Sequence, residues 1–157
     1  MIMQSFYDSP LGPLQIIVED NGVKALYFEN HRRPINHDAM VEGENDVTKR
    51  LHDQLELYFQ GQLKQFDIPI NPSGTEFQRK VWHALAEIPF GESRSYAQLA
   101  EAIGNPNAVR AVGAANGRNP ISIVVPCHRV IGKDGSLTGY AGGLDRKRWL
   151  LSHEGII

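Results

Sequence analysis

Cysteine is nearly absent from the sequence, because Cys127 is the only one among 157 residues. A single cysteine excludes an intramolecular disulfide and any structural zinc site built from several thiolates. A lone thiol is either a small buried apolar side chain or a nucleophile. Stability must come from a packed core, and a chain of this length buries roughly 68–70% of its unfolded surface.

Long apolar runs are also missing. The run at residues 16–18 is far shorter than the roughly 20 residues that span a bilayer, and residues 1–7 lack the features of a secretory signal. Hydrophobic residues make up 41% and charged residues 22%, as in ordinary soluble domains. Collagen-like, wholly disordered and coiled-coil classes are excluded. We expect a soluble, cytoplasmic protein with no membrane partner.

The net charge is small, −2, but it is unevenly distributed. Residues 1–72 hold 6 basic and 11 acidic residues, a net of −5, whereas residues 73–157 hold 10 and 7, a net of +3. Residues 94–148 hold 8 and 3, a net of +5. Such a stretch either attracts a polyanion locally or forms a solvated basic face.

Residues 1–72 are predicted to form an antiparallel sheet and one helix. Runs typical of strands at 5–7, 14–19 and 23–28 are separated by turn-forming residues at 8–13 and 20–22. Residues 30–45 lack apolar periodicity and are predicted to be a loop. From Val47 to Phe59 an apolar residue recurs every fourth position, which predicts an amphipathic helix ending at Gly61.

A linker at 71–74 predicts two domains, 1–72 and 73–157, and the second is predicted to be mainly helical. Thr75 is the expected N-cap of a helix that ends before Pro89. Short helices are predicted at 96–103 and 107–117, a strand at 121–125, and a last helix at 144–153 after a glycine-rich loop. The fold class is therefore α+β.

The helix pair at 96–117 resembles a helix-turn-helix in outline. Its second member is dense in alanine and glycine, and Arg110 is its one long charged side chain before Arg118. Small residues let a helix lie close to another backbone, whether protein or nucleic acid. The pattern leaves open both a DNA-binding element and an ordinary αα corner.

The sequence Pro126-Cys127-His128-Arg129 places a thiol beside an imidazole. A free cysteine with a pKa of about 8.5 is only slightly ionised near pH 7, so full ionisation would gain roughly ten- to thirtyfold in rate. Any larger acceleration must come from positioning and from protonation of the leaving group. His128 is the candidate base and Glu154 the acid that would orient it; an inert, buried Cys127 is the alternative.

Neither the other histidines nor the glycine-rich loop matches the pattern of a metal or cofactor site. His83 and His153 are expected to be ordinary helix residues, and the spacing of His31 and His37 matches no metal site. The glycines of residues 132–143 lack the order of a phosphate-binding loop. They would let the main chain close over a flat ligand. No metal and no cofactor is expected.

Together these blocks resemble one family. Residues 123–132 are similar to the acceptor-cysteine motif of the O6-alkylguanine-DNA alkyltransferases, also called methylated-DNA–protein-cysteine methyltransferases. The resemblance runs from about residue 77 to 155 and includes Ser95-Tyr96 and the blocks 110–113, 117–120 and 149–155 in matching order. Residues 1–72 fit the family's ribonuclease-H-like domain in length and pattern only. The whole chain resembles the bacterial constitutive type, without a regulatory extension.

The resemblance implies DNA repair by irreversible alkyl transfer. Cys127 would take the alkyl group of O6-alkylguanine, and also of O4-alkylthymine, by a single-turnover SN2 displacement after base flipping. His128, acting through a water and backed by Glu154, would deprotonate the thiol. Asn119 would hold the turn that orients these groups, and Tyr96 would donate to guanine N3.

The resemblance also implies how DNA is held by a monomer. Arg110 would fill the place of the flipped nucleotide, while the carbonyls of Cys127 and Val130 and the amide of Ala141 would read the guanine edge. The second helix would lie in the minor groove of double-stranded DNA containing O6-alkylguanine. The expected DNA contacts are Ser95, Ala108, Arg110, Ala111, Ala114 and Arg118.

The sequence departs from the family pattern in two ways, and two alternative functions remain open. Ala141 stands where animal relatives have serine, so a hydroxyl contact to O6 is lost, and the cysteine ligands of the zinc site of some relatives are absent. Alkyltransferase-like lesion sensors lack the acceptor cysteine, so Cys127 favours repair over sensing. A cysteine hydrolase using Cys127 and His128 is the other alternative, and it would have to regenerate its thiol.

Overall fold

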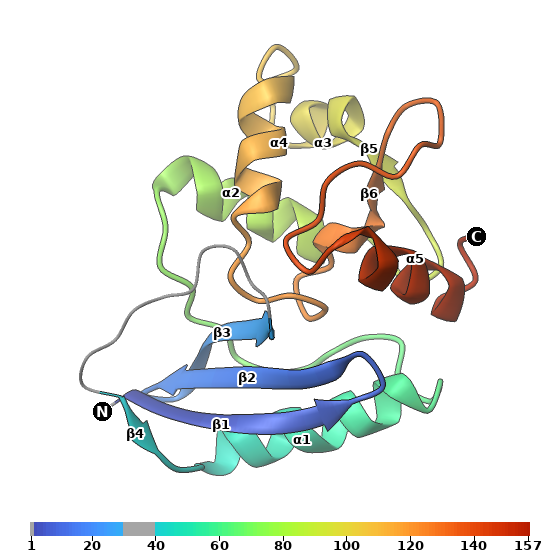
Figure 1. Cartoon of the computed structure of the whole chain (residues 1–157). Helices are drawn as coiled ribbons and strands as arrows, with labels where there is room; N and C mark the ends of the chain where they lie inside the picture. Colours follow the sequence, from blue (N-terminus) through green and yellow to red (C-terminus); the bar gives the residue numbers. More distant parts are fainter. Residues whose placement is uncertain (1, 30–39) are drawn as a thin grey trace.

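The computed structural model describes residues 2–29 and 40–157. His31, His37 and most of the predicted loop at 30–45 lie outside the described residues. A sheet and one helix occupy the lower half of Figure 1, and the remaining helices lie above them. None of the helices in the described ranges is both long and apolar enough to cross a membrane.

The sheet has the strand order β3-β2-β1-β4. β1 (Ile2–Ser9), β2 (Gly12–Glu19) and β3 (Gly22–Phe28) are antiparallel neighbours, as predicted, and the two-residue β4 (Val41–Glu42) pairs parallel to β1. The predicted turn at 8–13 is too long, because Asp8 pairs with Pro13 and Ser9 with Gly12. Strand pairing therefore continues through the proline-rich cluster and leaves a two-residue turn.

The predicted amphipathic helix is α1 (Asp46–Phe59), which lies along the sheet in Figure 1. Asn45 and Thr48 form a capping box at its N-terminus, which satisfies backbone N–H groups that have no partner inside the helix. Leu51, Leu55 and Tyr58 are completely buried. Tyr58 extends this buried face to the end of the helix that lies nearest the second half of the chain.

The second half contains four helices and a small parallel pair of strands. Thr75 caps α2 (Glu76–Ala86) as predicted, and α2, α3 (Tyr96–Ala102), α4 (Val109–Gly117) and α5 (Leu144–His153) confirm the four predicted helices. β5 (Arg94–Ser95) pairs with β6 (Val130–Ile131), which follows the single 3₁₀ turn Cys127–Arg129. This pairing brings the start of α3 beside the segment that carries Cys127.

The strand predicted at residues 121–125 is wrong. These residues form a tight turn in which the Val125 N–H donates to the Ile121 carbonyl at 3.0 Å and Ile123 has a φ of 71°. A β-branched residue with positive φ is strained. The amide of Asn119 bonds the carbonyls of Ile121 and Val125 at 3.3 and 2.8 Å and stabilises the turn. One side chain thus outweighs the strand propensity of five residues.

The two halves of the chain share a core. The Leu26 N–H of β3 donates to the Pro120 carbonyl at 2.8 Å, and the Ser122 N–H donates to the Leu26 carbonyl at 3.1 Å. One cluster of buried apolar side chains includes residues of the sheet, of α1 and of the later helices. The residues around Cys127 are therefore supported from below by the edge of the sheet.

Candidate active site

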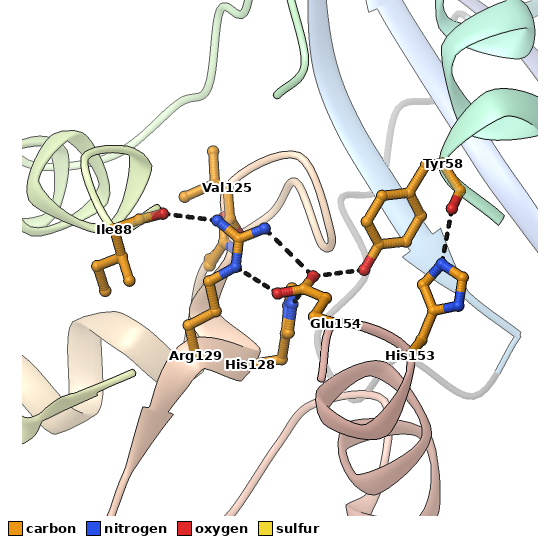
Figure 2. Close-up of polar contacts among 8 residues, drawn as sticks. Tyr58, Ile88, Val125, His128, Arg129, His153 and Glu154 are labelled. Carbon is orange, nitrogen blue, oxygen red and sulfur yellow. Dashed lines mark hydrogen bonds and ion pairs between the residues drawn. The ribbon is translucent and has the colours of Figure 1, made fainter. Parts of the chain in front are cut away.

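Glu154, at the C-terminal end of α5, is the centre of a buried polar network. Its Oε2 lies 2.7 Å from His128 Nε2 and accepts the Tyr58 hydroxyl at 2.5 Å. Arg129 Nε donates to Oε1 at 2.7 Å, and the same guanidinium donates to the Ile88 carbonyl at 2.6 Å. Figure 2 shows these donors converging on Glu154 from α1 and from the Cys127–Arg129 turn. The structure thus joins His128 to Glu154, as predicted.

The network fixes the charge of Glu154. Burial alone raises the pKa of a carboxyl group, but hydrogen bonds and charge from His128, Arg129 and Tyr58 outweigh it and lower the pKa of Glu154 to about 2. Burial lowers the pKa of His128, although Glu154 opposes this. Near neutral pH the pair is therefore a carboxylate and a neutral imidazole.

The tautomer of His128 follows from its partner. A carboxylate only accepts hydrogen bonds, so Nε2 carries the proton and Nδ1 keeps its lone pair. Nδ1 is buried and has no hydrogen-bond partner among the described residues. A buried imidazole with one nitrogen anchored and the other free to accept is the arrangement that general-base chemistry needs.

Cys127 is buried, with 4% of its surface exposed. Burial raises the pKa of its thiol, while hydrogen bonding from Asn119 and the charge of Lys147 act in the opposite direction. The thiol is therefore mainly protonated at rest and reacts only if a base removes its proton as the reaction proceeds.

Lys147 is a buried cation next to this thiol, and the sequence reasoning missed it. Its Nζ donates to the Val130 carbonyl at 2.6 Å and to the Thr138 carbonyl at 3.0 Å. Burial lowers its pKa to about 8, and the charge of Cys127 opposes that. It is still mainly protonated at pH 7. A carbonyl oxygen has two lone pairs, and the bond from Lys147 uses one of those of Val130, the carbonyl expected to read a base.

A cavity of about 580 Å³ lies between α4 and the glycine-rich loop. Tyr96, Ala114, Arg118 and Ala141, which the sequence reasoning singled out, line it. The Tyr96 hydroxyl and Thr138 Oγ1 are 2.6 Å apart, which ties the start of α3 to the loop. Burial, and next the charge of Cys127, raise the pKa of Tyr140, another lining residue, whereas Cys127 itself is not among the residues that line the cavity.

α4 exposes a stripe of small and basic residues. Val112, Ala115 and Asn116 face the interior, and Trp82 of α2 donates to the Ala115 carbonyl at 2.8 Å. The opposite side exposes Arg110, Ala111, Ala114, Gly117 and Arg118. Ala108 comes just before the helix and is half-buried, and Ser95 caps α3. The structure thus brings the predicted DNA contacts of α4 onto one open face.

The remaining histidines have ordinary surroundings. His83 is exposed and lies 3.6 Å from Glu87 one turn later, and His153 Nε2 lies 2.6 Å from the Tyr58 carbonyl. No group of three or more His, Cys, Asp or Glu side chains that could hold a metal ion is found in the part of the chain that the structure describes.

Comparison with known proteins identifies the family. The family model described as "6-O-methylguanine DNA methyltransferase, DNA binding domain" matches residues 76–156, and that of the ribonuclease-like domain matches residues 2–72. The chain belongs to the 6-O-methylguanine DNA methyltransferase family. The α+β fold with its N-terminal sheet is the fold of this family.

Individual relatives of this methyltransferase family match almost the whole chain. A methylated-DNA–protein-cysteine methyltransferase of Methanosarcina acetivorans is 51% identical over 96% of this chain and 97% of its own length. One from Mycobacterium bovis is 60% identical over 98% and 93%. The crystal structure of Mycobacterium tuberculosis OGT in complex with DNA superposes with a TM-score of 0.93 at 44% identity, covering 98% and 93% of the two chains.

Proposed function

We propose that this chain is a DNA repair transferase that moves the alkyl group of O6-alkylguanine in double-stranded DNA irreversibly to the sulfur of Cys127. The carrying observation is the buried His128–Glu154 pair, which leaves His128 Nδ1 free as a base in the turn that holds the thiol. The family membership of the chain supports the same chemistry. The reaction uses the residues of one chain, so we expect a monomer.

The chemical step is a displacement at the alkyl carbon. The sulfur–carbon bond forms as the bond from carbon to O6 breaks, and the bonding electrons leave with guanine. The thiol proton passes to His128 Nδ1 through a water, and the imidazolium is stabilised by Glu154. Tyr96 donates to guanine N3, so the base departs without a full negative charge. Asn119 holds the turn that keeps the sulfur in line.

Base recognition uses the cavity beside the thiol. The O6 position is inside the duplex, so the nucleotide must be extruded, which costs less for an altered base pair. The cavity of about 580 Å³ has the size of a small-molecule site. The carbonyls of Cys127 and Val130 and the amide of Ala141 read the guanine edge, and O4-alkylthymine presents a similar reactive oxygen.

DNA binding uses the open face of α4. Its alanines and Gly117 allow close approach to the minor groove, and Arg110 enters the stack in place of the extruded nucleotide. Ser95, Ala108, Ala111, Ala114 and Arg118 contact the backbone and groove around it. We place the reaction in the cytoplasm, because a reactive thiol persists in a reducing compartment.

The mass of the intact protein after incubation with an O6-methylguanine duplex tests this function. We expect one added methyl group per wild-type chain, saturating at one, and none on Cys127→Ser, which should bind the same duplex within about twofold. Selective binding of the lesion without a mass change would favour a sensor. Multiple turnovers with an unmodified thiol would favour a hydrolase. Either result overturns the proposal.

A further inference from the structure

Tyr58 is the one residue of α1 that reaches the catalytic network. Its ring is completely buried, and it packs against Phe66, Phe90 and His153. The hydroxyl donates to Glu154 Oε2 at 2.5 Å, across 96 positions of sequence. Figure 2 shows Tyr58 approaching Glu154 from the side of the first domain, opposite Arg129.

Tyr58 and His128 share one oxygen atom. Both bond Glu154 Oε2, at 2.5 and 2.7 Å, while the shorter of the two bonds from Arg129 to Glu154 is to Oε1, at 2.7 Å. A donor on a carboxylate oxygen takes up part of its negative charge and leaves less to stabilise a proton on a neighbouring imidazole. Arg129 also holds Oε2, at 3.2 Å, so the orientation of Glu154 survives without the Tyr58 hydroxyl.

Tyr58 remains a donor throughout the useful pH range. Burial, followed by the charge of Glu154, raises its pKa far above the ordinary value. The other ionisable groups that face the His128–Glu154 pair come from several elements. They are Arg129 and Cys127 of the 3₁₀ turn, Lys147 of α5, and Tyr140 of the glycine-rich loop. His153 of α5 faces Tyr58 itself, with ring centroids 5.1 Å apart and its Nε2 2.6 Å from the Tyr58 carbonyl. Tyr58 is the group that the first domain adds to these.

We propose that Tyr58 is a positioning residue for alkyl transfer: by occupying Glu154 Oε2 it limits how strongly that carboxylate attracts a proton to His128, and so keeps His128 available as a base. This inference rests on the proposed function. It gives the N-terminal domain a part in the chemistry as well as in folding.

Tyr58→Phe tests the inference, because it removes the hydroxyl and keeps the packed ring. Without this donor, Glu154 holds a protonated His128 more firmly. The acidic limb of the single-turnover transfer rate should therefore move upward by roughly 0.5–1 pH unit. At a pH on that limb the rate should fall about three- to tenfold, while the plateau rate and the affinity for the lesion duplex stay within about twofold.

Tyr7→Phe is the matched control. Tyr7 also belongs to the first domain and also donates to a carboxylate, Glu56 Oε2, at 2.7 Å, but outside the network. It should leave the pH profile unchanged. If wild type transfers alkyl groups and both variants have its profile, or if both move it alike, the inference is wrong and the proposed function stands. If wild type transfers nothing, the function itself fails.

A second variant keeps the test decisive if Tyr58→Phe does not fold. Difluorotyrosine placed at position 58 retains the ring and has a more acidic hydroxyl, so its bond to Glu154 is stronger. The acidic limb should then move to lower pH. No movement, or movement to higher pH, would overturn the inference.

Discussion

Two sets of basic side chains in the second half of the chain differ in almost every physical respect. Arg110 on α4 and Arg118, the residue that follows this helix, are exposed and form no ion pair with any residue that the structure describes. Arg129 and Lys147 are buried, and each donates to at least two acceptors. Each set adds two positive charges to the net of +5 over residues 94–148, but the charge of Arg129 is offset by Glu154, which lies outside that stretch, and only the exposed set can contact a polyanion directly.

The exposed set is suited to binding a polyanion, and the buried set to fixing the geometry of the reacting groups. Exposed charges are screened by salt and cost little to change, which suits a surface that binds and releases a polyanion. Buried charges are expensive unless every hydrogen bond is made, so they fix geometry. Glu154 with Arg129, His128 and Tyr58 is such a fixed centre. The charged residues of a sequence therefore have to be sorted into exposed and buried ones before their net charge predicts a binding partner.

Among the variants considered, Glu154→Gln should lose the most unfolding free energy, because the charge that it removes is buried. The amide leaves the buried guanidinium of Arg129 without its anion, and breaking a buried pair in this way costs about 3–5 kcal/mol of unfolding free energy. Alkyl transfer should also fall strongly, because His128 loses the charge that stabilises its protonated form. Urea unfolding and single-turnover rates measure the two effects.

Glu92→Gln is the exposed counterpart of that variant. Glu92 lies 3.1 Å from Arg94 in an ion pair that is about half exposed on the acidic side. Surface pairs of this kind contribute about 0–1 kcal/mol. Equal losses of stability in the two variants would remove the distinction between buried and exposed charge.

Acid should destabilise the protein through Glu154. Its pKa falls from an ordinary 4.5 to about 2 on folding, so the folded state binds the proton less readily than the unfolded chain. The stabilisation is complete above the unfolded pKa and is lost as pH falls from about 4.5 towards 2. It amounts to something on the order of 3 kcal/mol.

The pH dependence is measured as a difference. The gap in unfolding free energy between wild type and Glu154→Gln should narrow as pH is lowered from 5 to 3, because a protonated Glu154 resembles the amide. Other carboxylates titrate in both proteins and cancel. A constant gap over this range would mean that the network does not hold Glu154 as an anion.

Local patterns in the sequence predict most of the helices. Periodic apolar residues and capping residues such as Thr75 act within one turn, so the start of α2 and the bounds of α5 agree with expectation. The failure at residues 121–125 has a different origin, because the Asn119 amide competes with strand formation through bonds that a propensity argument does not count.

The residues of the candidate site also divide into those that the sequence predicts and those that it does not. Cys127, His128 and Glu154 were accessible from the motif and the family resemblance. Lys147 and Tyr58 were not, because lysine in a helix is usually exposed and a tyrosine on an amphipathic face is usually a core residue. Their roles depend on partners 17 and 96 positions away. No local signal carries that information; burial with a bonded polar atom reveals it.

Arg110→Ala should have the smallest effect on the protein and a selective one on the reaction. Arg110 is exposed and unpaired among the described residues, so unfolding free energy should change by less than about 0.5 kcal/mol. Repair of O6-methylguanine in a duplex should slow about three- to tenfold, because no side chain replaces the extruded nucleotide. Transfer from a free O6-alkylguanine base, which needs no extrusion, should be unchanged. Arg148→Ala, an exposed arginine on α5, controls for loss of one positive charge. Equal losses on duplex and free base would place Arg110 in the chemical centre and erase the division between the two sets of cations.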